Sequence, residues 1–155
     1  MDLYEAILNR RSHRFFKPEM PPREVLERII NAGLWAPSGT NAQPWEITVL
    51  AGSYRDEFVE HAAHCIAHMR VILKEANLPE KGQDMVIKFF QNLGGAPVVI
   101  AVTIDKLNDP GMMEAFIQSG AALMQNMLLA AHVEGLGTCW MTGPNFVANE
   151  LLEYL

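Results

Sequence analysis

The chain has 155 residues, of which 50% are hydrophobic and 19% are charged, as is typical of a globular protein with one buried core. Its formal net charge of −6 argues against nucleic acid as a partner, because such binding needs a cationic surface. No uninterrupted apolar run reaches the roughly 18 residues of a membrane span, and the N-terminus lacks the pattern of a signal peptide. We therefore expect one cytoplasmic domain over residues 1–155, and two cysteines suit a reducing compartment.

A basic cluster follows a short helix that is predicted at residues 2–9. Five of the twelve Lys and Arg residues lie in the first 23 positions, and residues 10–14 read Arg-Arg-Ser-His-Arg. Guanidinium groups bind phosphate oxygens in pairs, and a serine hydroxyl can fill a remaining hydrogen-bonding position. The cluster is therefore a candidate phosphate site. A solvated basic helix end is the alternative, since basic runs are weak motifs.

A polar loop follows the amphipathic helix that is predicted at residues 23–34. The loop, residues 35–45, reads WAPSGTNAQPW and has no carboxylate. Its backbone N–H groups, hydroxyls and amides can therefore approach an anion without repulsion, whereas the alternative is an ordinary Gly/Pro turn. An alternating β-strand is predicted directly after it, at residues 46–50.

Four potential metal ligands lie on a helix that is predicted at residues 54–74. His61, His64, Cys65 and His68 fall on neighbouring turns of one face. Zinc ligands on one helix normally come as a single pair, with the others from elsewhere, and the chain contains no second cluster. We therefore predict no metal site and interpret these histidines as exposed or partly packed, with a helical metal-binding module as the rival.

The second half of the chain is organised around a long apolar helix predicted at residues 112–133. A helix that is hydrophobic on all sides is buried on all sides, so part of it is expected to pack against a second subunit. A helix at 79–93 and a continuous apolar strand at 97–104, typical of the centre of a sheet, are predicted before it. A third central strand at 138–141 and a last helix at 145–155 are predicted after it.

Three patterns stand in order along the chain: RRSHR at 10–14, PSGTNAQPW at 37–45 and GLGTCWMTG at 135–143. Together they resemble the FMN-dependent nitroreductase family, and the resemblance covers essentially the whole chain. The glycines of the third pattern precede a predicted strand instead of opening a helix, so they do not form a dinucleotide-binding fingerprint. A Walker lysine, a GxSxG elbow and a paired-carboxylate arrangement are all absent from the sequence.

This resemblance implies an α+β fold, a three-layer α/β/α sandwich with a mixed central sheet flanked by helices, in an intertwined homodimer with FMN at the subunit interface. It implies an oxidoreductase that transfers hydride from NADH or NADPH through FMN to a nitroaromatic or quinone, by a ping-pong mechanism. No catalytic side chain is expected, because flavin N5 carries the chemistry. The alternatives are flavin fragmentation or dehalogenation, or a protein that binds flavin without turnover.

The resemblance also assigns residues to the flavin. Arg10 is expected to meet the phosphate, and Arg14 to lie near the pyrimidine edge of the ring, where its charge stabilises reduced flavin. The backbone of residues 141–143 is expected to pass close to N5. The expected cofactor-binding residues are Arg10, Arg11, Ser12 and Arg14 from one subunit, Pro37, Ser38, Gly39 and Asn41 from the other, and Met141, Thr142 and Gly143.

Members of this family usually continue after the last helix into another strand and a tail, which carries a basic residue for the FMN phosphate. The sequence ends at Leu155, so the resemblance implies that this strand and tail are absent. It leaves open whether Leu155 is the natural end, which group replaces the basic residue, which acceptor is physiological, and whether NADH or NADPH is the donor.

Overall fold

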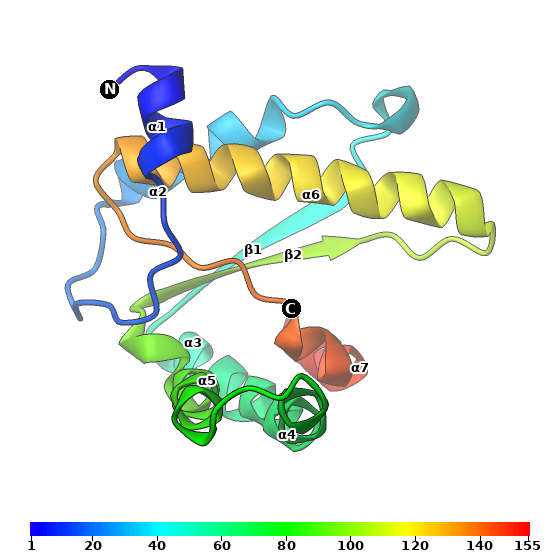
Figure 1. Ribbon diagram of the computed structural model, residues 1–155. Helices are drawn as coiled ribbons and strands as arrows, with labels where there is room; N and C mark the ends of the chain where they lie inside the picture. The colour runs from blue at the N-terminus through cyan, green and yellow to red at the C-terminus, as the bar shows by residue number, and fades with distance from the viewer. The chain divides into compact units, whose positions relative to one another are not determined.

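The computed structural model describes residues 1–155, which divide into two compact units (Figure 1). Unit 1 consists of Met1–His13, Pro21–Thr48 and Ile100–Trp140, and unit 2 consists of Arg14–Met20, Val49–Val99 and Met141–Leu155. None of the helices combines the length and the hydropathy that crossing a lipid bilayer requires. Each unit has its own core and is described separately.

The core of unit 1 lies between α2 (Arg23–Leu34) and α6 (Pro110–Val133). Gly33 allows the two helices to approach closely, because a Cβ at this position would lie 2.6 Å from Cγ of Met127. Apolar residues at helical spacing on both helices then interlock and exclude water. The buried cluster consists of Ile29, Ala36, Leu123, Met127 and Ala131.

Only one stripe of α6 is buried within the chain, although its sequence is apolar on nearly every side. The exposed positions include Ile117, whose relative accessibility is 54%. Helix α1 (Leu3–Asn9) also contacts α6 but buries only Ala6. The expectation that a second subunit covers the remainder of α6 stays a prediction. The buried residues of α6 are Phe116, Ser119, Gly120, Leu123, Met127 and Ala131.

Capping side chains fix where two helices of unit 1 begin. The Asp109 carboxylate accepts a hydrogen bond from the backbone N–H of Met112 at 2.8 Å, and Pro110 occupies the first turn, where a missing N–H does no harm. At α1, Asp2 and Glu5 form a reciprocal capping box. Both helix starts therefore follow from local sequence.

Strands β1 (Trp45–Ala51) and β2 (Val98–Ile104) pair into a two-stranded sheet. The backbone N–H of Asp105 donates to the carbonyl of Pro44 at 3.2 Å, so the residue after β2 meets the residue before β1. The strands are therefore antiparallel. Both strands run within one residue of their predicted bounds.

The prediction of a third strand at 138–141 is wrong. Thr138 alone forms an isolated parallel bridge, to Ser12, and the rest of the segment has no regular structure. A β-prone sequence becomes a strand only where a neighbouring segment can satisfy a row of its N–H and C=O groups. Within unit 1, the segment around Ser12 pairs with residues 138–141 at Thr138 alone.

Unit 2 consists mostly of helices, together with the end of β1, the start of β2 and the irregular segment Arg14–Met20. The helix predicted at 54–74 is divided, because the backbone tightens into the 3₁₀ turn η2 (Ala63–Cys65). The C-terminal helix predicted at 145–155 is also divided, into η4 (Gly143–Val147), a short α7 and η5 (Leu152–Tyr154). The α-helices of unit 2 are α3 (Gly52–Ala62), α4 (Ile66–Glu75), α5 (Glu80–Asn92) and α7 (Ala148–Leu151).

Candidate functional site

The arginines at the end of α1 have different local roles. The guanidinium group of Arg11 donates hydrogen bonds to the carbonyls of Leu8 and Arg10, at 2.7 and 2.9 Å. It therefore satisfies acceptors at the C-terminus of α1 that the helix leaves unpaired. The guanidinium group of Arg10 makes no ion pair or hydrogen bond within unit 1. We expected both arginines at a phosphate, and the capping role of Arg11 was not among the predictions.

Unit 1 brings the first and third sequence patterns together. The backbone N–H of His13 donates to the carbonyl of Thr138 at 2.9 Å, beside the bridge between Ser12 and Thr138. Gly137 packs closely on His13, because a Cβ on it would lie 3.0 Å from the His13 ring. Ser12 of the basic cluster is thus paired with the start of the third sequence pattern, residues 135–143.

The loop that carries the second pattern is fixed to α6. The backbone N–H of Gly39 donates to Oγ of Ser119 at 3.1 Å, and Ser119 in turn donates to the carbonyl of Ala115 at 2.7 Å. Ser119 is the one buried polar residue of the chain. Its role as the anchor of this loop was not apparent from the sequence, where it interrupts an apolar helix without an obvious reason.

The same loop has an unusual backbone. Thr40, Asn41 and Gln43 have φ angles of 53°, 57° and 48°, in the left-handed region that non-glycine residues rarely adopt. The backbone N–H of Gln43 donates to Oγ of Ser38 at 3.0 Å, which holds the turn closed. Such conformations tend to cluster at ligand-binding sites. Pro37 and Asn41 are exposed, whereas Ser38 and Gly39 are partly buried.

Arg14 belongs to unit 2, where its backbone packs on Gly94. A Cβ on Gly94 would lie 2.2 Å from the Arg14 carbonyl oxygen, and Gly94 has φ of +67°, so only glycine fits. The backbone N–H of Phe16 donates to the carbonyl of Gly94 at 3.0 Å. Arg14 is exposed, and its guanidinium group has no ion pair within the unit.

Residues 141–143 also belong to unit 2. Gly143 is buried against the ring of Phe90, and a Cβ on it would lie 2.6 Å from that ring. This packing explains why a glycine occupies position 143, without reference to any ligand. Met141 is partly buried and Thr142 is exposed, so their backbone can be approached from outside the unit.

The His61–His68 cluster does not form one site. Cys65 is fully buried, and burial raises the pKa of its thiol, so it is a poor ligand. His68 stacks on Phe146 with ring centroids 5.4 Å apart. His61 and His64 instead contact Glu150, and the hydrogen bond from His61, followed by that from His64, holds the pKa of the Glu150 carboxyl below its usual range.

The side chains present fit a phosphorylated polar ligand. Arg10 and Arg14 each offer a permanently charged fork of N–H donors that has no partner inside its unit. The carboxylates of Asp2 and Glu5, which could neutralise Arg10, accept backbone N–H groups at the other end of α1 instead. Taken by itself within its own unit, each of these two guanidinium groups is a suitable donor to a phosphate or carbonyl oxygen of such a ligand.

The family of this α+β chain follows from comparison with known proteins. Residues 7–155 match the model of the nitroreductase family. The chain therefore belongs to the nitroreductase family.

Two solved structures share its fold. A nitroreductase with bound FMN from Desulfitobacterium hafniense DCB-2 is 29% identical, with a TM-score of 0.70 over 94% of this chain and 73% of that chain. A BluB-like flavoprotein from Clostridium difficile 630 is 27% identical, with a TM-score of 0.73 over 99% of this chain and 80% of that chain. These likenesses confirm the predicted nitroreductase-like α+β fold.

A sequence relative is the nitroreductase NfnB of Mycolicibacterium smegmatis. It is 35% identical over 106 residues, which amount to 61% of this chain and 45% of that protein. The matched part is thus less than half of NfnB.

Proposed function

We propose that the protein is an FMN-dependent NAD(P)H oxidoreductase that reduces a nitroaromatic or a quinone by a ping-pong mechanism. The observation that carries this proposal is the match to the nitroreductase family over residues 7–155. The solved relative from Desulfitobacterium hafniense, which is named as a nitroreductase with bound FMN, supports the choice of cofactor. FMN, when bound, would supply the hydride-transfer chemistry.

Arg10 and Ser12 would bind the FMN phosphate. Arg10 has an unpaired guanidinium group, and such a group can bind phosphate oxygens in a bidentate manner. Ser12 is exposed two residues further along the chain. Arg11 has one guanidinium nitrogen engaged by α1 carbonyls and would contribute its remaining donors. These residues bind and orient, and none of them needs to move a proton.

Arg14 would stabilise negative charge at the pyrimidine edge of the ring, because a positive charge fixed in place before reaction favours the anionic reduced form. Residues 37–41 would approach the ring from the partner subunit, in a loop kept rigid by the Gly39–Ser119 hydrogen bond. The backbone at Met141 and Thr142 would lie on the N5 side.

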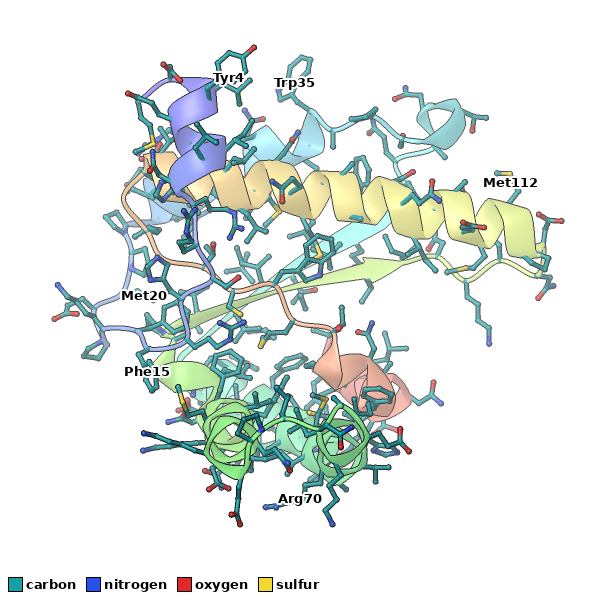
Figure 2. All side chains as sticks on the ribbon, viewed as in Figure 1. Tyr4, Phe15, Met20, Trp35, Arg70 and Met112 are labelled. Carbon is teal, nitrogen blue, oxygen red and sulfur yellow. The ribbon has the colours of Figure 1, made fainter.

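The homodimer is part of the proposal, and exposed apolar side chains of unit 1 support it. Tyr4 and Trp35 are 76% and 81% exposed, and Figure 2 shows their rings projecting away from the ribbon. Ile117 on α6 is also exposed, at 54%, and large apolar side chains that gather on a surface usually mark an interaction site. We propose that a second copy of the chain covers this surface.

Anaerobic spectroscopy tests the proposed function. The purified protein should contain one FMN per chain, and NADH or NADPH should bleach the flavin band within seconds. A nitroaromatic or quinone added afterwards should restore it, and double-reciprocal plots should give parallel lines. Bound flavin that neither nucleotide reduces would contradict the oxidoreductase and favour flavin binding without turnover.

The assigned role of Arg14 has its own test. Arg14→Ala should lower the flavin midpoint potential by about 30–60 mV, since a hydrogen bond to a charged group contributes about 1.5–3 kcal/mol and about 30 mV corresponds to 1.4 kcal/mol. Arg70→Ala, which removes another exposed arginine of unit 2 (Figure 2), is the control. Equal potentials in the two variants would show that Arg14 does not lie at the ring.

A further inference from the structure

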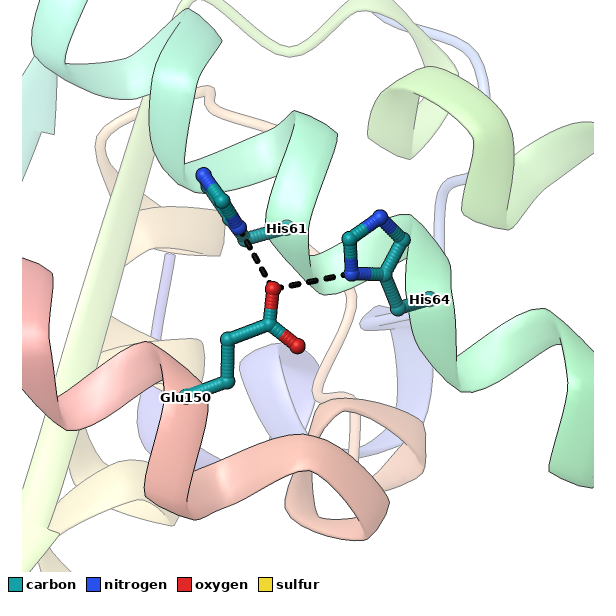
Figure 3. A group of neighbouring side chains, drawn as sticks. All are labelled: His61, His64 and Glu150. Atoms are coloured by element: carbon teal, nitrogen blue, oxygen red, sulfur yellow. Dashed lines mark hydrogen bonds and ion pairs between the residues drawn. The ribbon is translucent and has the colours of Figure 1, made fainter.

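Three side chains of metal-binding type converge in unit 2, and none is among the residues assigned to the flavin. Figure 3 shows the rings of His61 and His64 directed at the carboxylate of Glu150. Their Nδ1 atoms lie 2.5 and 2.8 Å from the same oxygen, Oε1 of Glu150. The three ligand atoms all fall within 4.8 Å of one another.

Helical spacing and the packing of α7 produce this convergence. His61 lies in the last turn of α3 and His64 in η2, three residues later, so both rings share a face. Ala62 and Cys65, which directly follow them, are fully buried. Because α7 packs against α3, Glu150 reaches the two histidines from a distant part of the sequence.

The ring of His61 is also held in place by an aromatic neighbour. Tyr154 stacks on it with centroids 4.3 Å apart and an interplanar angle of 27°. Stacking of this kind restricts the ring plane, and the restricted ring directs Nδ1 at the point where the other two ligands meet.

We propose that His61, His64 and Glu150 form a binding site for a divalent transition-metal ion of the zinc type. The two Nδ1 atoms and Oε1 of Glu150 are the ligands. Zinc takes imidazole nitrogen and carboxylate oxygen, whereas Mg²⁺ and Ca²⁺ prefer oxygen ligands alone. Three protein ligands leave the fourth tetrahedral position for water.

The geometry needs only a small adjustment to accept the ion. With Zn–N and Zn–O bonds of about 2.0–2.2 Å, the ligand atoms of a tetrahedral ion lie about 3.4 Å apart. The shorter separations seen here are hydrogen bonds, in which a proton occupies the space that the ion would take. A retreat of the Glu150 carboxylate by about 1 Å opens that space, and its side chain is only partly buried.

The ion would connect the C-terminal segment to the middle of unit 2. Glu150 lies in α7, and Tyr154 follows in η5, so coordination by Glu150 holds this short helical segment against α3 and η2. A ligand that binds the folded form alone stabilises it by mass action. Zinc should therefore raise the melting temperature of the protein.

Titration calorimetry on the purified full chain, with its flavin as isolated and after dialysis against a chelator, tests the proposal. We expect one Zn²⁺ to bind per chain and MgCl₂ to give no saturable heat. His64→Ala and Glu150→Gln should each weaken zinc binding at least about tenfold, since even the loss of an outer partner weakens metal affinity about 10–100-fold. Zinc should raise the melting temperature of the wild-type protein and not that of Glu150→Gln.

Two variants on the same segments serve as matched controls. His68→Ala removes a histidine one turn away, and Glu153→Gln removes a carboxylate three residues from Glu150. Both should bind zinc as the wild type does, and all variants should keep the wild-type circular dichroism and flavin content. The proposal is overturned if no one-to-one phase appears, or if that phase is unchanged in either His64→Ala or Glu150→Gln. Neither result bears on the flavin chemistry.

Discussion

Helices α5 and α6 lie in different units and differ in the side chains that they expose to water: α5 exposes charged residues, and α6 exposes mostly uncharged ones. α5 has four charged side chains among 13 residues, and it buries Ile87, Phe89 and Phe90 while its charged residues remain exposed. α6 has 24 residues and a single charged one, Glu114. The apolar positions of α5 are therefore mostly covered within its own unit, whereas those of α6 outnumber the core positions that unit 1 offers.

This contrast shows how local sequence can encode assembly. A helix with one apolar stripe is satisfied by one layer of neighbours, as α5 is by α3 and α4. A helix that is apolar nearly all round needs partners on more than one side, and α2 covers only one stripe of α6. Because α6 has more apolar side chains than unit 1 covers, we expect a dimer.

The largest expected effect comes from a charge on the exposed side of α6. Ile117→Asp should weaken dimer association about 100-fold or more, because an uncompensated charge buried in an interface costs about 3–5 kcal/mol. Sedimentation velocity over a concentration series measures the change. Met85→Asp on α5, at a position of similar exposure, is the matched control and should leave association unchanged. Equal effects of the two variants would remove the contrast between the helices.

A cavity in the buried stripe of α6 should lower the free energy of unfolding by nearly as much as Ile117→Asp lowers the free energy of dimer association. Leu123 is fully buried in the unit 1 core, so Leu123→Ala should lower the free energy of unfolding by about 2.7–5 kcal/mol. Urea denaturation followed by circular dichroism measures it. Met85→Ala, on the exposed face of α5, should change stability by less than about 0.5 kcal/mol. A loss below about 1 kcal/mol for Leu123→Ala would mean that this core is wrongly described.

Alanine substitutions at two helical glycines give smaller effects: Gly33 lies in the contact of α2 with α6, and Gly82 lies in α5 with no neighbouring atom. A Cβ on Gly82 of α5 meets no atom within 4 Å, so Gly82→Ala should stabilise the protein by about 0.5–1 kcal/mol. Gly33 faces Met127 of α6, and overpacking there costs about 1–3 kcal/mol. Gly33→Ala should therefore destabilise by about 0.5–2 kcal/mol net. Effects of the same sign in both variants would contradict the close contact of α2 with α6.

The smallest expected effect concerns the ion pair at the end of α6. Arg28 donates to both carboxylate oxygens of Glu134, at 2.7 and 2.6 Å, and the hydrogen bond from Arg28 holds the pKa of Glu134 below its usual range. A lowered pKa in the folded state adds stability above the ordinary glutamate pKa of about 4.3, and this stability is lost as the pH falls through the lower value.

Denaturation midpoints at about pH 6 and about pH 3 test this sign. The wild type should lose more stability between the two than Glu134→Gln does, by a small amount because the pair is exposed. Glu46→Gln, which removes an exposed carboxylate without an ion pair, should behave as the wild type. A wild type that is less sensitive to acid than Glu134→Gln would refute the assignment.

Local patterns predicted most of the fold. The helix at 23–34 has the predicted bounds, and β1 and β2 differ by single residues, because periodicity and helix-capping signals lie within a few residues of each other. The strand at 138–141 was wrong because strand formation depends on a distant pairing segment, which propensity does not specify.

The candidate site divides in the same way. The three motifs and their order were visible in the sequence, and unit 1 does bring Ser12 beside Thr138. The anchoring of Gly39 by Ser119 and the approach of Glu150 to His61 join residues 80 and 89 positions apart. Such contacts arise from tertiary packing, so no local pattern predicts them.

Sedimentation velocity with detection at both the protein band and the visible flavin band shows whether FMN binds at a dimer interface. We expect a single dimeric species that carries the flavin absorbance at one FMN per chain. The Ile117→Asp variant should lose dimer and flavin absorbance together, because residues 37–41 are proposed to reach the flavin across the interface. A monomer that sediments with stoichiometric FMN, or a dimer without flavin, would show that FMN does not bind at a dimer interface.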